Sequence, residues 1–122
     1  MEKILFYSDS GSRQEEIRKI CQKYNLELRI ILREELGCTL LSLYNASKVS
    51  CSYRVPVFFT QPEVLVFAGF REDRLDEFLK IFARESTKAI PHKAVMTMYN
   101  AEWTVLKLTE ELKKEAKAFG QE

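Results

Sequence analysis

A run of small polar residues follows the first apolar segment of the chain and forms the first candidate binding loop. Serine hydroxyls and the free amides that open a helix can hold a phosphate or a carboxylate. The run matches neither glycine-rich phosphate motif, and its aspartate would repel an anion. Two interpretations stay open, an anion site and a simple capping turn, for the same residues: Ser8, Asp9, Ser10, Gly11 and Ser12.

Two later loops also carry residues that could contact a ligand. In the first, Gly69 allows a close backbone approach, Phe70 supplies an apolar group and Arg71 can pair with an anion. The second loop runs from Thr97 to Trp103. Its Asn100 is expected to cap the last helix, and its tryptophan to stack on a planar ligand or to fill a gap in the core. For both loops the alternative is a purely structural role.

The cysteines and the single histidine do not support catalysis or metal binding. A zinc site needs about four ligands, whereas the three cysteines are widely spaced. His92 precedes a predicted strand, at the opposite end of the sheet from the candidate loops, so it is not placed to activate a nucleophile. We therefore assign no catalytic residue, no metal ligand and no cofactor. An odd number of cysteines without a C-x-x-C pair favours reduced, buried thiols and the cytoplasm.

Apolar runs and helical periodicity alternate along the chain. The predicted strands cover residues 3–7, 27–32, 64–68 and 93–98. Apolar residues recur at helical spacing in the stretches 12–24, 36–44, 72–82 and 100–119. A capping box formed by Ser12 and Glu15 is expected to start the first helix. The segment 46–62 reads as a surface connection with an extended stretch at 55–59.

This alternation predicts an α/β fold in a single domain spanning residues 1–122. We expect a small, mainly parallel four-stranded sheet in the order 2-1-3-4, with helices on both faces, as in flavodoxin-like or Rossmann-like folds. The alternative is a ferredoxin-like α+β fold. Ligands of parallel sheets dock at the carboxyl ends of the strands, which would bring residues 8–12 and 69–71 side by side. The residues show no recognisable internal repeat.

The second half of the chain carries a more specific pattern. It reads V-F-A-G-F at 66–70, P-H-K-A-V-M-T-M-Y-N-A-E-W at 91–103 and L-K-L-T-E-E-L-K-K-E at 106–115. Over about residues 63–117 it resembles a family of small bacterial proteins known as a domain of unknown function, with the signature K-A-V-x-T-x-x-N-x-x-W. The signature positions are Lys93, Ala94, Val95, Thr97, Asn100 and Trp103. The resemblance implies a bacterial, cytoplasmic protein of uncharacterised activity, and it supplies no catalytic residue.

The net charge and the lengths of the apolar runs argue against nucleic-acid binding and membrane insertion. The 19 basic and 18 acidic residues nearly cancel, so no charged surface is expected for nucleic acid or an anionic membrane. No apolar run approaches the roughly 20 residues that cross a bilayer, and no secretory leader is expected.

We therefore expect a non-catalytic binding or regulatory module that acts through loops at the strand ends. Its partner would be a protein or a small anionic ligand. One alternative is a small enzyme that binds an anionic substrate at residues 8–12. Another is a homodimeric interaction subunit that pairs through the apolar residues 55–59.

Overall fold

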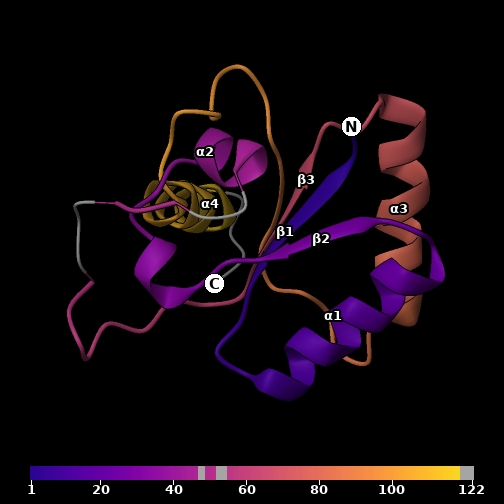
Figure 1. The fold of residues 1–122 in the computed structure, drawn as a ribbon, viewed down its shortest axis with the longest axis horizontal. Coiled ribbons are helices and arrows are strands. Elements are labelled where there is room, and N and C mark those ends of the chain that lie inside the picture. The colour runs from indigo at the N-terminus through magenta and orange to yellow at the C-terminus, as the bar shows by residue number, and fades with distance from the viewer. Residues whose placement is uncertain (47–48, 52–54, 119–122) are drawn as a thin grey trace.

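The protein is described here by a computed structural model that covers residues 1–46, 49–51 and 55–118. One sheet carries helices on both of its faces (Figure 1). In chain order the elements are β1 (Lys3–Tyr7), α1 (Gly11–Lys23), β2 (Glu27–Ile30), the 3-10 turn η1 (Arg33–Glu35), α2 (Leu40–Asn45), β3 (Val64–Ala68), α3 (Glu72–Glu85), β4 (Lys93–Val95) and α4 (Val105–Ala118).

The strand order is β2-β1-β3-β4, which confirms the predicted α/β class and the predicted order. The pairs β1–β2 and β3–β4 are parallel, but the central pair β1–β3 is antiparallel, so the expectation of a mainly parallel sheet is only partly right. The reason lies in the connection between β2 and β3. After α2, Tyr44 bonds to Met1 at the start of β1, and the chain then returns to the other end of β1, where Glu63 accepts from Ser8. Because α2 lies between β2 and β3, the ferredoxin-like order is not formed.

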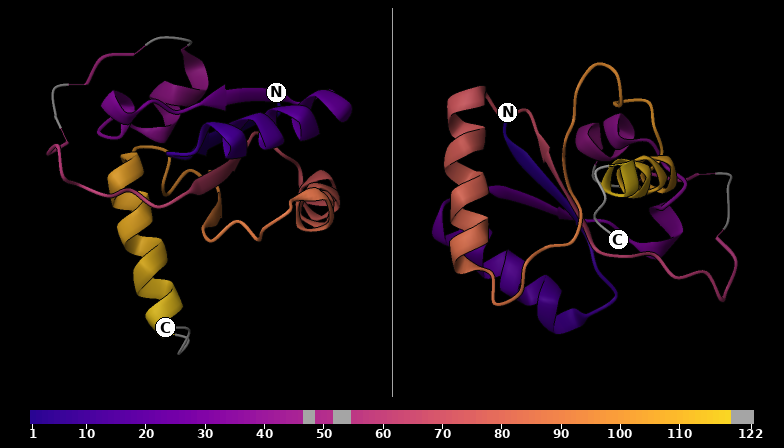
Figure 2. Two further views of the ribbon diagram at one scale, coloured as in Figure 1. Left: turned by 90° about the horizontal axis from the view of Figure 1, so that it is seen from below. Right: turned by 180° about the vertical axis from the view of Figure 1, so that it is seen from behind.

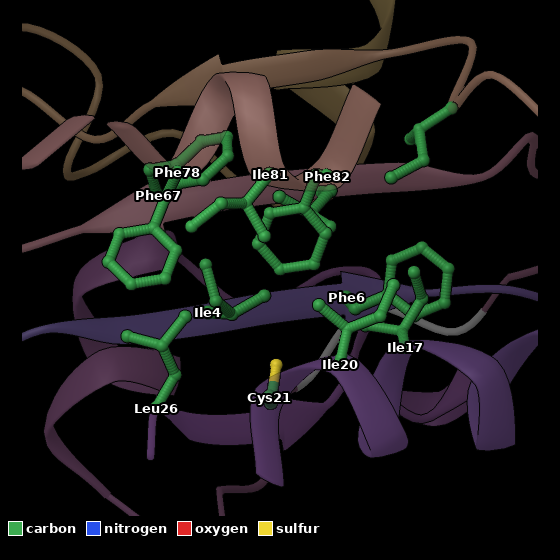
Figure 3. Close-up of a cluster of buried hydrophobic side chains, with 12 residues drawn as sticks. Ile4, Phe6, Ile17, Ile20, Cys21, Leu26, Phe67, Phe78, Ile81 and Phe82 are labelled. Atoms are coloured by element: carbon green, nitrogen blue, oxygen red, sulfur yellow. The ribbon is translucent and has the colours of Figure 1, made fainter. Parts of the chain in front are cut away.

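Each face of the sheet has its own apolar core. The first core lies under α1 and α3, where Ile4 and Phe6 of β1 meet Phe67 of β3 (Figure 3). The second core lies under α2 and α4 and contains Leu5 and Val66. Successive strand residues point to opposite faces, so covering both faces explains why β1 and β3 are apolar almost throughout. Figure 2 shows the two helix pairs on opposite sides of the sheet.

The two halves of the chain repeat one series of elements, a repeat that is not recognisable from the residues alone. We call residues 2–46 the first repeat and residues 63–111 the second. In the first, the carbonyl of Phe6 accepts from the Ile31 amide at 2.8 Å. In the second, the carbonyl of Phe67 accepts from the Met96 amide at 2.9 Å. The two halves therefore form matching β-α-β units, each followed by a helix on the second core.

Hydrogen bonds between the repeats are reciprocal, as a two-fold axis between β1 and β3 requires. The Leu40 amide donates to the Trp103 carbonyl at 2.9 Å, and the Val105 amide donates to the Cys38 carbonyl at 3.2 Å. Ion pairs follow the same rule, since Arg13 of α1 bonds to Glu63 and Arg74 of α3 bonds to Glu2. Each repeat thus contacts the other through equivalent groups.

Two local predictions are wrong. The N-cap of α1 is Ser10, whose hydroxyl accepts from the Arg13 amide at 3.2 Å, so the helix starts earlier than the Ser12 capping box would allow. Residues 55–59 are not extended. They form a turn in which the Phe59 amide donates to the Pro56 carbonyl at 3.0 Å. Proline at 56 has no amide to donate to a neighbouring strand, which disfavours an extended pairing.

The prediction of reduced cysteines is also wrong, because Cys38 and Cys51 form a disulfide, with their Cα atoms 5.4 Å apart. Cys21 is the free thiol, and burial raises its pKa to about 12, so it stays protonated. Cysteine spacing is therefore no longer a reason to place the protein in the cytoplasm. Within the described ranges, none of the helices combines the length and the apolar character that crossing a membrane requires.

Candidate functional site

The antiparallel central pair separates the predicted loops. Residues 8–12 follow β1 at one end of the sheet, whereas residues 69–71 follow β3 at the opposite end. The expectation that these two loops lie side by side is therefore wrong. Since β3 and β4 are parallel, residues 69–71 instead share their end of the sheet with Thr97.

The polar groups of residues 8–12 bond mainly to their own surroundings. Ser8 is buried; its hydroxyl donates to Glu63 at 2.9 Å and accepts from the Ser10 amide at 3.1 Å. The Ser10 and Ser12 hydroxyls lie 3.0 Å apart. Asp9 accepts from the Tyr7 hydroxyl, and burial together with this bond raises the pKa of Tyr7. Gly11 has open space where a side chain would begin.

The nearest buried cation, Arg13, is fully engaged. It donates to Glu63 at 3.1 Å, to Glu16 at 3.2 Å and to the Lys88 carbonyl at 2.8 Å. Its guanidinium thus has partners on each nitrogen, and the Glu63 carboxylate lies where an anion would have to bind.

The loop after β3 has structural contacts at each predicted site residue. Gly69 has a φ of 79°, and a side chain there would collide with the Met1 carbonyl, so close backbone approach requires glycine. The Phe70 ring packs edge-on against Phe67, with ring centroids 5.4 Å apart. Arg71 is exposed and pairs with Asp73 at 3.3 Å.

Asn100 does not cap α4, and the prediction that it does is wrong. Its Oδ1 accepts from the Thr97 amide at 2.8 Å, and its Nδ2 donates to the Val95 carbonyl at 3.0 Å. The side chain therefore closes the turn that follows β4. The cap of α4 is Thr104, whose hydroxyl accepts from the Lys107 amide at 3.1 Å.

Trp103 is half-buried and packs against the second core. The Nζ of Lys107 lies 5.5 Å from the centre of its ring, within the range of a cation–π contact. The ring thus contributes to the core and also contacts a cation at the surface.

A groove of about 410 Å³ lies between β4 and α4. All six signature residues line it: Lys93, Ala94, Val95, Thr97, Asn100 and Trp103. The helix contributes one face with the spacing i, i+3, i+4 and i+7, formed by Leu108, Glu111, Leu112 and Glu115. Tyr99, which is 83% exposed, completes the lining. The predicted residues after β4 are therefore brought together, but with β4 and α4 rather than with the other two loops.

Residues 63–119 match a family described as a domain of unknown function, DUF3783. This match confirms the resemblance to a domain of unknown function over residues 63–119, and the matched segment contains the whole groove and the second repeat. Neither the curated proteins nor the solved structures yielded a match to the chain.

The sequence patterns did not indicate the helical wall of the groove. The helical spacing in the stretch 100–119 predicts that Leu108 and Leu112 face inward, but it gives no role to Glu111 and Glu115 on the same helix face. Hydrogen bonds from Lys107 and Lys114 lower the pKa of Glu111, so its carboxylate is charged at neutral pH. Acidic residues on an otherwise apolar helix face were the signal available.

Two other features do not make a better site. A hollow of about 610 Å³ lies beside Arg33 and Cys51, but its wall comes from the 46–62 connection, part of which lies outside the described residues. In the described part of the chain, no cluster of three or more His, Cys, Asp or Glu side chains is placed to hold a metal ion.

Proposed function

We propose that the protein is a non-catalytic binding module that takes up an extended segment of a partner protein in the groove between β4 and α4. The observation that carries this proposal is that the groove opens beside β4, which is an edge strand of the sheet that the described residues form. Edge strands offer backbone groups to an added strand, while side pockets select its side chains.

The backbone of β4 is arranged for such an addition. The His92 carbonyl and the Met96 amide bond to β3. In a parallel pair the alternate residues direct their backbone groups outward, here Lys93 and Val95. The Asn100 side chain donates to the Val95 carbonyl. The backbone amide and carbonyl of Lys93 and the amide of Val95 are then the groups to which a partner can bond. A short segment of two or three residues can pair there.

The alternatives have less support. An anionic ligand at residues 8–12 would compete with the Glu63 carboxylate and with bonds already formed by Ser8 and Arg13. A homodimer through residues 55–59 would have to use Val57 and Phe58, which are 95% and 90% exposed, because Phe59 is half-buried against the second core. Phe58→Asp would then halve the mass measured by light scattering; an unchanged mass would count against a dimer through this turn.

The proposal is tested by selecting binders from a random peptide library and mapping them on the protein. Trp103 is the only tryptophan, so its fluorescence reports occupation of the groove directly. Val95→Pro removes the outward amide without breaking a bond to β3, and we expect it to weaken peptide binding at least about tenfold.

Ile30→Pro is the matched control, because it makes the same change on the opposite edge of the sheet, in β2. Thermal melts of both variants establish that they fold. If selected peptides leave Trp103 fluorescence unchanged, or bind Val95→Pro as tightly as the original protein, the proposed function is wrong.

A further inference from the structure

The two repeats carry different residues at one equivalent position of their edge strands. In the first repeat this position is Arg29 of β2, which lies opposite Leu5. In the second it belongs to Ala94 of β4, which lies opposite Val66. Leu5 and Val66 both point into the second core, so Arg29 and Ala94 occupy equivalent places on the same face of the sheet.

In the first repeat the arginine lies buried beside the edge strand, and a hollow of about 340 Å³ remains along that edge. The Arg29 side chain is only 10% exposed and donates to the Glu35 carboxylate at 2.6 Å. Its other terminal nitrogen donates to the carbonyl of Ala46, at the end of α2. A guanidinium therefore fits between the edge strand, the following turn and the helix.

The second repeat keeps the turn but lacks the arginine. Glu35 accepts from the Leu32 amide at 3.0 Å, and Asn100 accepts from the equivalent Thr97 amide at 2.8 Å. The position of Ala46 is taken by Glu111, a residue of the groove lining whose carboxylate accepts from Lys107 and Lys114. The space that Arg29 fills is thus open in the second repeat, and an acidic side chain has been added to its wall.

The carboxylates in the groove lining can pair with a cation in place of the lysines that Glu111 now contacts. Glu111 and Glu115 outnumber Lys93, so the lining has a net charge of one negative unit. Glu111 pairs with the exposed Lys107 and Lys114, and such surface pairs exchange at little cost. Lys107 also lies over the Trp103 ring, a position from which a guanidinium can displace it.

We infer that the groove recognises its partner through an arginine side chain, which enters beside Ala94 where the first repeat places Arg29. This inference rests on the proposed function and specifies the anchor residue of the bound segment. The guanidinium would lie between Asn100 and Glu111 and face Trp103.

The anchor is tested with three synthetic pentapeptides that differ only at the central residue: arginine, citrulline, which has the same shape without the charge, and glutamate. Trp103 fluorescence measures their binding to the full chain. We expect the arginine peptide to bind about tenfold more tightly than the citrulline peptide, as a charge-assisted bond should. Glu111→Gln should remove most of this preference, and Lys93→Ala should strengthen arginine binding.

Ala94→Arg gives a second test, since it recreates the first repeat's own arginine inside the groove. We expect this variant to lose arginine-peptide binding. Ala83→Arg is the matched control, because Ala83 is exposed on α3, on the other face of the sheet. The arginine anchor is wrong if the arginine and citrulline peptides bind equally well. If these peptides still change Trp103 fluorescence and still bind Val95→Pro more weakly, the proposed function stands. No binding by any selected peptide would overturn both.

Discussion

The two repeats share a backbone plan but differ at the outer edge of the sheet. Beside β2, the buried Arg29–Glu35 pair fills the space under α2. Beside β4, Ala94 and Asn100 leave a groove under a helix of 14 residues, against six in α2. The turn after each edge strand keeps the same side-chain bond to its backbone. Both edges are hollowed, but the edge beside β2 holds a buried ion pair where the edge beside β4 has only Ala94 and Asn100.

The largest expected effect comes from breaking the pair in the first repeat. Glu35→Ala leaves Arg29 charged, buried and without its carboxylate, so we expect the free energy of unfolding to fall by about 3–5 kcal/mol. Asn100→Ala, the equivalent change in the second repeat, removes only neutral hydrogen bonds and should cost about 1–2 kcal/mol. Urea denaturation followed by circular dichroism measures both.

The double variant Arg29→Ala/Glu35→Asn copies the second repeat into the first. It leaves no unpaired charge, so it should be more stable than Glu35→Ala alone. If the double variant is no more stable than that single variant, Arg29 is not held by Glu35 in the way described.

Sequence patterns predicted the α/β class and the strand order because buried strands and amphipathic helices alternate visibly. They did not predict the antiparallel centre, because apolar runs such as residues 64–68 carry no information on strand direction. Direction is set by the 46–62 connection, which lacks regular periodicity. The residue types alone indicated the candidate loop at Thr97–Trp103. Which other segments lie beside this loop depends on the strand directions, which the sequence did not predict.

The repeat is not recognisable in the sequence because packing requires residues of the same polarity and size, and not the same residues. Residues 13–20 and 74–81 share the pattern R-x-x-E-x-x-K-I, yet the next elements match in only a few positions, such as Thr39 and Thr104. Four extra residues before β4 also shift the alignment between the two halves. Hydrogen bonds reveal the repeat because they are made by the backbone.

The disulfide bond is a second difference between the repeats, with the next largest expected effect on stability. Cys38 occupies the position that Trp103 has in the second repeat, and its bond to Cys51 spans 13 residues. Reduction with dithiothreitol should lower the free energy of unfolding by about 3 kcal/mol, the value expected for a loop of this size. Cys51→Ser should show the same loss and no further response to the reductant. Thiol titration of the unfolded, unreduced protein should find one free cysteine; three would contradict the bond.

The smallest expected change in the free energy of unfolding concerns the two equivalent ion pairs between the repeats. The side chain of Arg13 is 8% exposed and that of Arg74 is 39% exposed. Arg13→Ala removes the cation from Glu63, which keeps only the Ser8 hydroxyl, and removes the donor to the Lys88 carbonyl, so it should cost about 1–3 kcal/mol. Arg74→Ala should cost less, because water replaces its exposed bonds.

Acid titration sharpens this last difference. The hydrogen bond from Arg74 lowers the pKa of Glu2 below its ordinary value. A carboxyl group with a lowered pKa stabilises the folded state at pH values above its unfolded pKa, and this contribution disappears as the pH falls through its folded pKa. The stability difference between the original protein and Arg74→Ala should therefore be full at pH 7 and vanish in acid, as measured by urea denaturation at several pH values. A difference that stays constant between pH 7 and acid would show that Arg74 acts through its cation–π contact with Phe78 rather than through its bond to Glu2.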